Sequence, residues 1–380
     1  MVHEIQSSVR KYFGHIDALL FVPALLISLA GLITMYSYSG SNIFFERQML
    51  WLGISVVVFL AVSFVDLRFL RRTSVVTFLY LTTVLLLLAV FVFGDVVKGA
   101  QSRFDLGVLA IQPAEYAKLI IVILLAKYFT RRHIEIAHVK HIILSGVYAF
   151  IFFVLILLQP DFGSAIMIFF VWFGMVLVSG ISKRHLLAVG IIGLLSVAAM
   201  WTFVFVEYQK DRILTFIDPL ADVRGTGYNA YQSTIAVGSG QLLGKGIGYG
   251  TQSKLQFLPE YETDFIFASF AEEWGFIGVV FLFILFAALI WRILGYAHLG
   301  ATNFETLFAL GVAIWFISHF TVHVGMNIGM MPVTGVTLPF MSYGGSHLLV
   351  EFTALGMLVA MRRYARAVHQ DDTHREFIGV

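Results

Sequence analysis

Repeated apolar runs long enough to cross a lipid bilayer constrain this chain more than any other feature of its sequence. A helix needs about 20 residues to cross a hydrocarbon core about 30 Å thick, and the runs show none of the alternation of barrel strands. Since 59% of the residues are hydrophobic and 13% are charged, a soluble fold could not bury the apolar surface. The runs lie at residues 17–37, 48–65, 73–94, 113–130, 141–158, 164–180, 186–206, 265–291, 307–330 and 346–361. We therefore predict an all-α, polytopic integral membrane protein with about ten transmembrane helices.

Basic residues gather on one side of the predicted membrane. They lie at both ends of the chain and in the even-numbered loops, at Arg10, Lys11, Arg68, Arg71, Arg72, Arg131, Arg132, Lys140, Lys183, Arg184, Arg292, Arg362, Arg363 and Arg366. The positive-inside rule then places both termini in the cytoplasm. The predicted parts are a cytoplasmic segment 1–16, a transmembrane domain 17–361 and a cytoplasmic tail 362–380, with a long extracytoplasmic loop at about 207–263 between the seventh and eighth helices. Because the basic residues are scattered and form no stripe, nucleic acid is not a predicted partner.

Lys118 lies inside the fourth apolar run, about 7–8 Å from its start at 1.5 Å per helical residue. An ionisable group at that depth costs several kcal/mol unless it faces a cavity or a partner. Glu115, one turn away, could cap the helix that begins near Pro113, or it could neutralise Lys118. The interpretation that we favour is that the two residues line a site for an anionic substrate.

Three carboxylates, Glu260, Glu262 and Asp264, stand at the outer end of the eighth apolar run. The helix dipole stabilises carboxylates near a helix N-terminus, so Asp264 could be a helix cap and no more. The alternative is a general base held at the membrane surface beside a lipid-linked substrate. Glu272 and Glu273 lie deeper in the same run, where an acid is either functional or a member of a buried pair.

The glycine-rich stretch from Gly238 to Gly248 does not match a nucleotide-binding P-loop. Gly240 and Gly244 enclose three residues instead of four, and Gly246 follows the lysine where Ser or Thr is needed. We expect the glycines to serve tight turns or a close approach of the backbone.

His319, His323 and Asn327 recur every four residues and form one polar stripe on the ninth helix. The zinc motif with two histidines at this spacing also needs a glutamate that is missing here, so packing against other polar groups is the preferred explanation. In the last outer loop, Ser342 and Ser346 accompany paired prolines and glycines. A rigid loop of this kind suits a phosphate or a sugar, although a tight helix connection explains it equally well.

Short segments spread along the membrane region form a family pattern. They are Lys98-Gly99-Ala100-Gln101 with Leu106-Gly107, Gln112-Pro113-Ala114-Glu115 with Lys118, Gln159-Pro160-Asp161-Phe162-Gly163, Gly250-Thr251-Gln252-Ser253, Phe257-Leu258-Pro259-Glu260, Thr263-Asp264-Phe265-Ile266-Phe267-Ala268, Asn327-Ile328-Gly329 and Ser342-Tyr343-Gly344-Gly345-Ser346. With these segments, roughly residues 15–365 resemble the SEDS family (shape, elongation, division and sporulation). The segment from Gly250 to Ser253 is more similar to the elongation branch than to the division or sporulation branch.

The resemblance implies a peptidoglycan glycosyltransferase that polymerises lipid II into glycan strands on the outer face of the bacterial cytoplasmic (inner) membrane. It also implies that the protein functions in an elongation complex with a class B penicillin-binding protein, which crosslinks the strands, and with other membrane proteins. Asp264 matches the aspartate that the family ties most closely to activity, and it is the candidate catalytic residue. Candidates for substrate binding are Lys98, Arg103, Glu115, Lys118, Asp161, Glu260, Ser342 and Ser346.

Glycosyl transfer from a polyprenyl pyrophosphate needs a base for the acceptor hydroxyl and positive charge for the departing pyrophosphate. Asp264 could supply the first, and Lys98, Arg103 or Lys118 the second. A divalent cation, Mg or Mn, could share the second task, although the sequence shows no dedicated cage for one. Two other functions stay open: a transporter that flips lipid II along the same polar residues, and a non-catalytic scaffold for the penicillin-binding protein.

Overall fold

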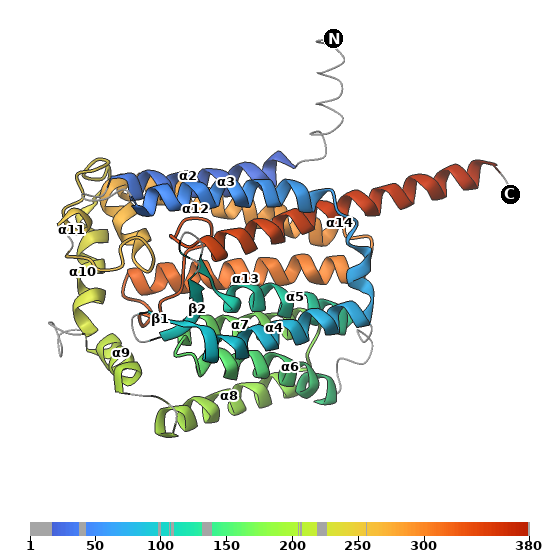
Figure 1. The fold of residues 1–380 in the computed structure, drawn as a ribbon, viewed down its shortest axis with the longest axis horizontal. Helices are drawn as coiled ribbons and strands as arrows, with labels where there is room; N and C mark the ends of the chain where they lie inside the picture. The colour runs from blue at the N-terminus through green and yellow to red at the C-terminus, as the bar shows by residue number, and fades with distance from the viewer. Residues whose placement is uncertain are drawn as a thin grey trace, which may run out of the picture.

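The computed structural model is a bundle of helices with three short strands near one end (Figure 1). It describes residues 17–37, 43–97, 100–105, 107, 110–130, 139–203, 205, 207–218, 226–255 and 257–378. Among these residues, ten helices have 17 residues or more: α2 (Ala18–Tyr36), α3 (Ile43–Ser63), α4 (Thr73–Phe93), α5 (Pro113–Thr130), α6 (Val139–Leu157), α7 (Phe162–Val178), α8 (Lys183–Phe203), α12 (Ile266–His298), α13 (Asn303–Asn327) and α14 (Gly345–Ile378). Each predicted apolar run corresponds to one of these helices, which confirms the all-α, polytopic architecture.

Most of the long helices suit a membrane by length and composition. Seven are long and apolar enough to span one, namely α2, α3, α4, α6, α8, α12 and α13, and α7 is a shorter apolar helix. Large apolar side chains stay exposed on the outside of the bundle, as Phe78, Leu85, Val92 and Phe93 of α4 do. A surface of this kind fits hydrocarbon and would be unfavourable in water.

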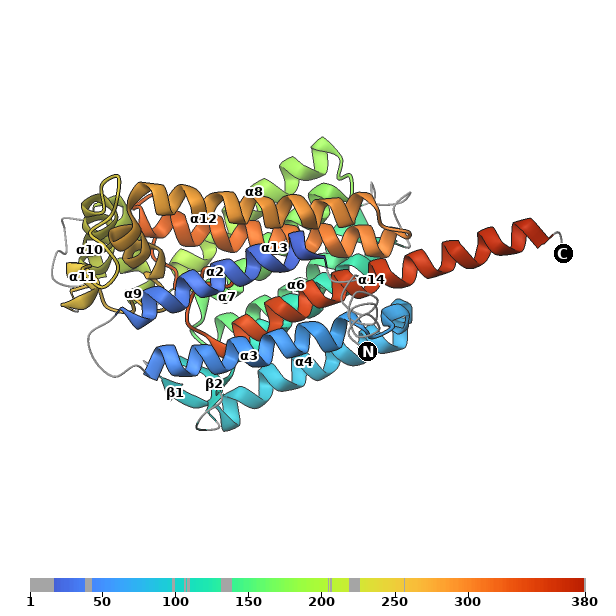
Figure 2. The same cartoon turned by 90° about the horizontal axis from the view of Figure 1, so that it is seen from above.

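The two ends of the bundle carry different elements. Figures 1 and 2 place α10 (Thr226–Ser239) and α11 (Thr251–Lys254) at one end and show α14 projecting from the other. At the projecting end, Asp17 caps α2 and accepts hydrogen bonds from Arg292 of α12 and Arg362 of α14. The short helix η1 (Leu67–Arg71) packs against α14 at the same end. Basic residues of three distant segments therefore meet there.

The predicted extracytoplasmic loops contain regular structure in addition to the ten long helices. Within the predicted loop 207–263 lie α10, α11 and also α9 (Glu207–Ile217). Within the loop after α4, the strands β1 (Asp95–Val97), β2 (Ala100–Asp105) and β3 (Ala110–Ile111) pair antiparallel in the order β1-β2-β3. At the other end of the chain α14 continues to Ile378, so the last helix runs well past residue 361.

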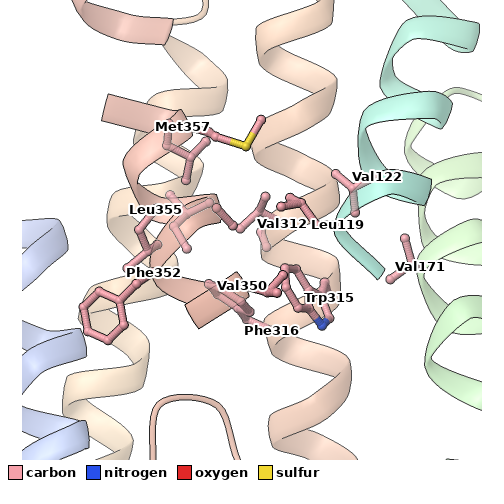
Figure 3. Packing of buried hydrophobic residues seen from close by; sticks show 14 of the residues in the cluster. Leu119, Val122, Val171, Val312, Trp315, Phe316, Val350, Phe352, Leu355 and Met357 are labelled. Carbon is pink, nitrogen blue, oxygen red and sulfur yellow. The ribbon is translucent and has the colours of Figure 1, made fainter. Parts of the chain in front are cut away.

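The apolar core extends through the bundle, and Figure 3 shows the part of it where residues of α5, α7, α13 and α14 pack together. Leu119 of α5, Trp315 and Phe316 of α13 and Val350 of α14 are almost fully buried there. Lys118 and Glu351 are the chain neighbours of two of these residues, so both ionisable groups border a region from which water is excluded. Electrostatic interactions are strong in such surroundings, because the effective dielectric constant is low.

Candidate active site

A polar cavity of about 60 Å³ lies between the first turns of α5 and α7, one face of α13 and the loop before α14. The residues that line it are Gln112, Glu115, Lys118, Asp161, Gly163, Ser164, His319, Gly335, Val336 and Thr337. Since α5 follows directly on β3, the cavity lies in the half of the bundle toward the strands. Three predicted site residues, Glu115, Lys118 and Asp161, therefore meet in one place.

Lys118 is the central charge of the cavity. Its Nζ atom donates to Glu115 Oε1 at 2.7 Å and lies 3.4 Å from His319 Nε2. His319 Nδ1 lies 3.1 Å from the carbonyl oxygen of Thr337, so the ring donates there and presents Nε2 to the lysine as an acceptor. An ammonium has three N–H donors. As far as the described residues go, two are directed at these partners and one remains for an anion in the cavity.

Asp161 combines a structural task with a place in the cavity wall. It is the N-cap of α7, where Oδ1 accepts from the backbone N–H of Ser164 at 2.9 Å. Its second oxygen, Oδ2, accepts from Gln112 Nε2 at 2.9 Å. The carboxylate thus joins the start of α7 to the start of α5 and fixes the polar rim of the cavity.

Asp264 lies immediately before α12, beside the cavity and not among its lining residues. The N-cap of α12 is Phe265, and its side chain makes no capping hydrogen bond within the described residues. Asn327 Nδ2 donates to the Asp264 carbonyl oxygen at 2.9 Å and holds the backbone in place. Asp264 Oδ2 is 3.5 Å from the point where a side chain on Gly335 would begin, and Gly335 lines the cavity. The half-buried carboxylate therefore borders the cavity across a glycine.

The other predicted site residues occupy different positions. Ser342 is fully buried and ties two loops together, donating to the Thr263 carbonyl oxygen and accepting from Leu338 N–H, both at 2.8 Å. Ser346 accepts from Gln112 N–H at 3.1 Å and so supports the cavity rim from outside. Arg103 lies on β2 opposite Asp95, and Lys98 falls outside the described residues.

Glu260 lies in the turn before Asp264 with a positive φ of 52° and does not line the cavity. Its carboxylate Oε2 is 3.3 Å from the Thr263 hydroxyl. Burial raises the pKa of the neighbouring Tyr261 phenol, helped by the charges of Glu262 and Glu260. The acidic turn is thus an ordered part of the loop before α12.

The glycine-rich segment wraps around a kink in α12 at Gly275, which has a φ of +66°. Lys245 N–H and Gly246 N–H donate to the carbonyl oxygens of Glu272 and Glu273. The Glu272 carboxylate accepts from Lys245 Nζ at 2.7 Å and from the backbone of Thr251 and Gln252. These contacts support the prediction of a loop that turns tightly, and they make Glu272 the buried partner of the more exposed Lys245.

The polar stripe on α13, predicted to pack against other polar groups, contacts mainly the backbone of neighbouring loops. His323 Nδ1 lies 2.6 Å from the Val336 carbonyl oxygen, and Asn327 bonds the backbone of Asp264, His323 and Ala268. His319 alone of the three lines the cavity. His347 and Glu351 of α14 are not among the predicted site residues, although an ionisable pair spaced four residues apart inside an apolar run was a signal for them.

The residues that the structure describes do not fit a resident metal ion. Among the described residues, no group of three His, Asp or Glu side chains is placed to hold one. Near the cavity, both oxygens of Asp161 accept hydrogen bonds, and Glu115 is engaged by the Lys118 ammonium, which would repel a cation. The arrangement suits an anion beside Lys118 and a proton acceptor at Asp264.

Comparison with known proteins places this geometry in context. Residues 10–367 match the cell cycle protein family of FtsW, RodA and SpoVE. The peptidoglycan glycosyltransferase MrdB of Escherichia coli K12 is 33% identical over 353 residues, which cover 93% of this chain and 95% of MrdB. The stage V sporulation protein E of Bacillus subtilis is 34% identical over 361 residues, covering 92% of this chain and 98% of that protein.

Two solved structures share the fold. The RodA protein of Thermus thermophilus is 30% identical, with a TM-score of 0.69 over 91% of this chain and 96% of that one. A chain from a peptidoglycan synthase complex, solved to show how polymerisation and crosslinking are coordinated, is 32% identical. Its TM-score is 0.78 over 92% of this chain and 98% of the other.

Proposed function

This chain belongs to the FtsW, RodA and SpoVE family, and we propose that it polymerises lipid II during cell elongation with Asp264 as general base. It is an enzyme, a peptidoglycan glycosyltransferase, as the relatives that it matches along most of its length are named. The observation that carries the proposal is the buried Lys118 ammonium in a cavity that Asp264 borders across Gly335.

The reaction joins the acceptor hydroxyl oxygen to the anomeric carbon of the donor sugar and breaks the bond from that carbon to the pyrophosphate. Asp264 would take the hydroxyl proton, and general-base help of this kind contributes typically about 10²–10⁴-fold. Lys118 would stabilise the negative charge that develops on the departing pyrophosphate. Because the cavity measures about 60 Å³, only a charged group of the substrate fits inside, and the sugars and the lipid would lie outside it.

The multi-pass protein would lie in the bacterial inner membrane with both termini and the basic end in the cytoplasm. The clustering of Arg292, Arg362 and η1 at the end from which α14 projects supports this orientation. A cysteine replacing Leu243, which is 76% exposed near α10, should react with a membrane-impermeant maleimide added outside intact spheroplasts. Labelling only after the inner face is opened would reverse the orientation.

A class B penicillin-binding protein is the proposed partner, together with other membrane proteins of the elongation complex. The similarity to a chain of a peptidoglycan synthase complex that coordinates polymerisation and crosslinking supports a crosslinking partner. A divalent cation, if the reaction needs one, would arrive with the substrate, because the described residues offer no cage for it. Chelation followed by addition of Mg or Mn to the polymerisation assay tests that requirement.

The deciding experiment uses the purified protein in detergent with lipid II and a class B partner that lacks a transferase domain. Formation of glycan polymer supports the enzyme, because detergent removes the two membrane sides that a lipid II transporter requires. Absence of polymer with folded protein and bound partner would overturn the proposal and favour the transporter or the scaffold.

A further inference from the structure

A row of four buried ionisable groups runs from the cavity into the core of the bundle. It begins at Lys118, passes through Glu115 on α5, and continues through His347 and Glu351, which lie one turn apart on α14. The exposed fractions are 1%, 4%, 3% and 0% in that order. The first two groups belong to the candidate active site, whereas the last two have no task in the reaction described above.

His347 faces acceptor oxygens from both ring nitrogens. Nδ1 lies 3.5 Å from Glu115 Oε2 and 3.1 Å from the Thr337 hydroxyl. Nε2 lies 3.3 Å from Glu351 Oε1 and 3.3 Å from the Leu338 carbonyl oxygen. Since an imidazole donates from both nitrogens only when it is positively charged, these surroundings suit an imidazolium between two carboxylates.

Glu115 is consequently shared between two cations. Oε1 binds Lys118 at 2.7 Å, and Oε2 faces His347 at 3.5 Å with no shorter partner among the described residues. Where water is excluded, the attraction between opposite charges is strong, so His347 keeps Oε2 turned toward itself and away from Lys118. Without His347, the whole carboxylate could turn to Lys118 and neutralise the ammonium that faces the cavity.

We propose that His347 and Glu351 are positioning residues that hold part of the Glu115 charge away from Lys118, so that Lys118 keeps positive charge for the leaving pyrophosphate. Glu351 fixes the ring, because its Oε2 accepts from Phe340 N–H at 2.8 Å while Oε1 faces His347 Nε2. Neither side chain is among the residues that line the cavity, so both act through Glu115. The inference rests on the proposed glycosyltransferase function.

The test is a double-mutant cycle of His347→Ala and Glu115→Gln, read as kcat and KM for polymerisation of lipid II. His347→Ala alone should lower kcat on the order of 10- to 100-fold and change KM far less, because leaving-group charge develops in the transition state. In the Glu115→Gln background, His347→Ala should lower kcat by less than about threefold, since no carboxylate remains between Lys118 and His347. Glu351→Gln, which can still accept from Phe340 N–H, should lie between wild type and His347→Ala.

His141→Ala is the matched control, because His141 is a buried histidine on α6 whose Nδ1 lies 2.9 Å from the Tyr128 hydroxyl, away from the row. Its effect should be the same in both backgrounds. If His347→Ala does not fold, His347→Gln enters the same cycle, because it keeps one donor without the charge. If His347→Ala lowers kcat equally in the wild-type and Glu115→Gln backgrounds, this inference is overturned. The proposed function still stands in that case, provided that the wild type is active. An inactive wild type would overturn both.

Discussion

Two lysine–glutamate ion pairs, Lys118–Glu115 and Lys245–Glu272, have the same N–O distance of 2.7 Å and very different surroundings. Glu272 is fully buried and accepts from Lys245, Thr251 and Gln252, so its oxygens are well supplied with donors. Glu115 binds Lys118 through one oxygen, and its other oxygen has no partner within hydrogen-bonding geometry among the described residues. The Lys118 pair lines the polar cavity.

The difference shows why a buried acid is insufficient evidence of a catalytic role. Both glutamates lie in apolar helices, where an ionisable residue is a functional candidate by default. The donors around Glu272 fasten the glycine-rich loop to the kink of α12, which is a structural task. Around Lys118 and Glu115, by contrast, one ammonium donor and one carboxylate oxygen lack a hydrogen-bond partner among the described residues. These groups and the cavity beside them distinguish a site that can receive a ligand from a structural ion pair.

The largest expected effect belongs to Asp264, on the cavity side of this comparison. Asp264→Asn should lower polymerisation of lipid II by about 10²–10⁴-fold, because Asn cannot accept the acceptor proton. Thermal stability and partner binding should stay near wild type, since Phe265 holds the N-cap position and Asn327 still holds the Asp264 backbone. Near-normal polymer yield would refute the general-base role, and Asp264→Glu, with its charge moved by one methylene, should be poor but measurable.

The two lysines offer a direct contrast, because Met removes the charge from each while keeping most of the side-chain volume. Lys118→Met should lower kcat by about 10²–10³-fold, the usual loss for a donor that stabilises transition-state charge. Lys245→Met should keep kcat within about threefold and lower the thermal midpoint instead, with a cost of about 1–3 kcal/mol for the poorer pairing of Glu272. The comparison fails if both variants lose activity to the same extent.

A smaller effect tests whether Lys118 and Glu115 act as one unit. Lys118→Ala and Glu115→Ala should each weaken polymerisation, and the double variant should be less impaired than the two single losses combined. The direct contact at 2.7 Å is the reason, because removal of either partner already disrupts the other. Additive losses in initial rates would show two independent contributions.

The sequence predicted the ten helices and paired Glu115 with Lys118, and the structure adds Asp161 to the same cavity. Apolar length and the cost of an unpaired charge in a membrane are local properties, so a sequence reveals them. It could not show that Ser342 would serve as an internal tie between loops, since that contact joins residues 79 positions apart. The row of four ionisable groups from Lys118 to Glu351 likewise depends on how α14 packs beside α5. The spacing of residues within either helix does not determine that packing.

The smallest effect on activity is expected in the glycine-rich loop, whose backbone donates hydrogen bonds to Glu272 and Glu273. Gly244 has a φ of +82°, and a Cβ there would collide with the Glu273 carbonyl oxygen. Gly244→Ala should therefore destabilise the protein by about 1–3 kcal/mol through strain and overpacking. Gly238 on α10 is the matched control, because nothing lies within 4 Å of the position that its Cβ would take.

Gly238→Ala should be neutral or stabilise the protein by up to about 1 kcal/mol, since alanine is the better helix former. The midpoint of thermal denaturation in detergent should thus fall for Gly244→Ala and hold or rise for Gly238→Ala. At a temperature where both are folded, each variant should polymerise lipid II within about threefold of wild type, because the cavity around Lys118 is left intact. A large loss of turnover in folded Gly244→Ala protein would mean that the glycine-rich loop takes part in the reaction. The Lys245–Glu272 pair could then no longer be called structural in contrast to the catalytic Lys118–Glu115 pair.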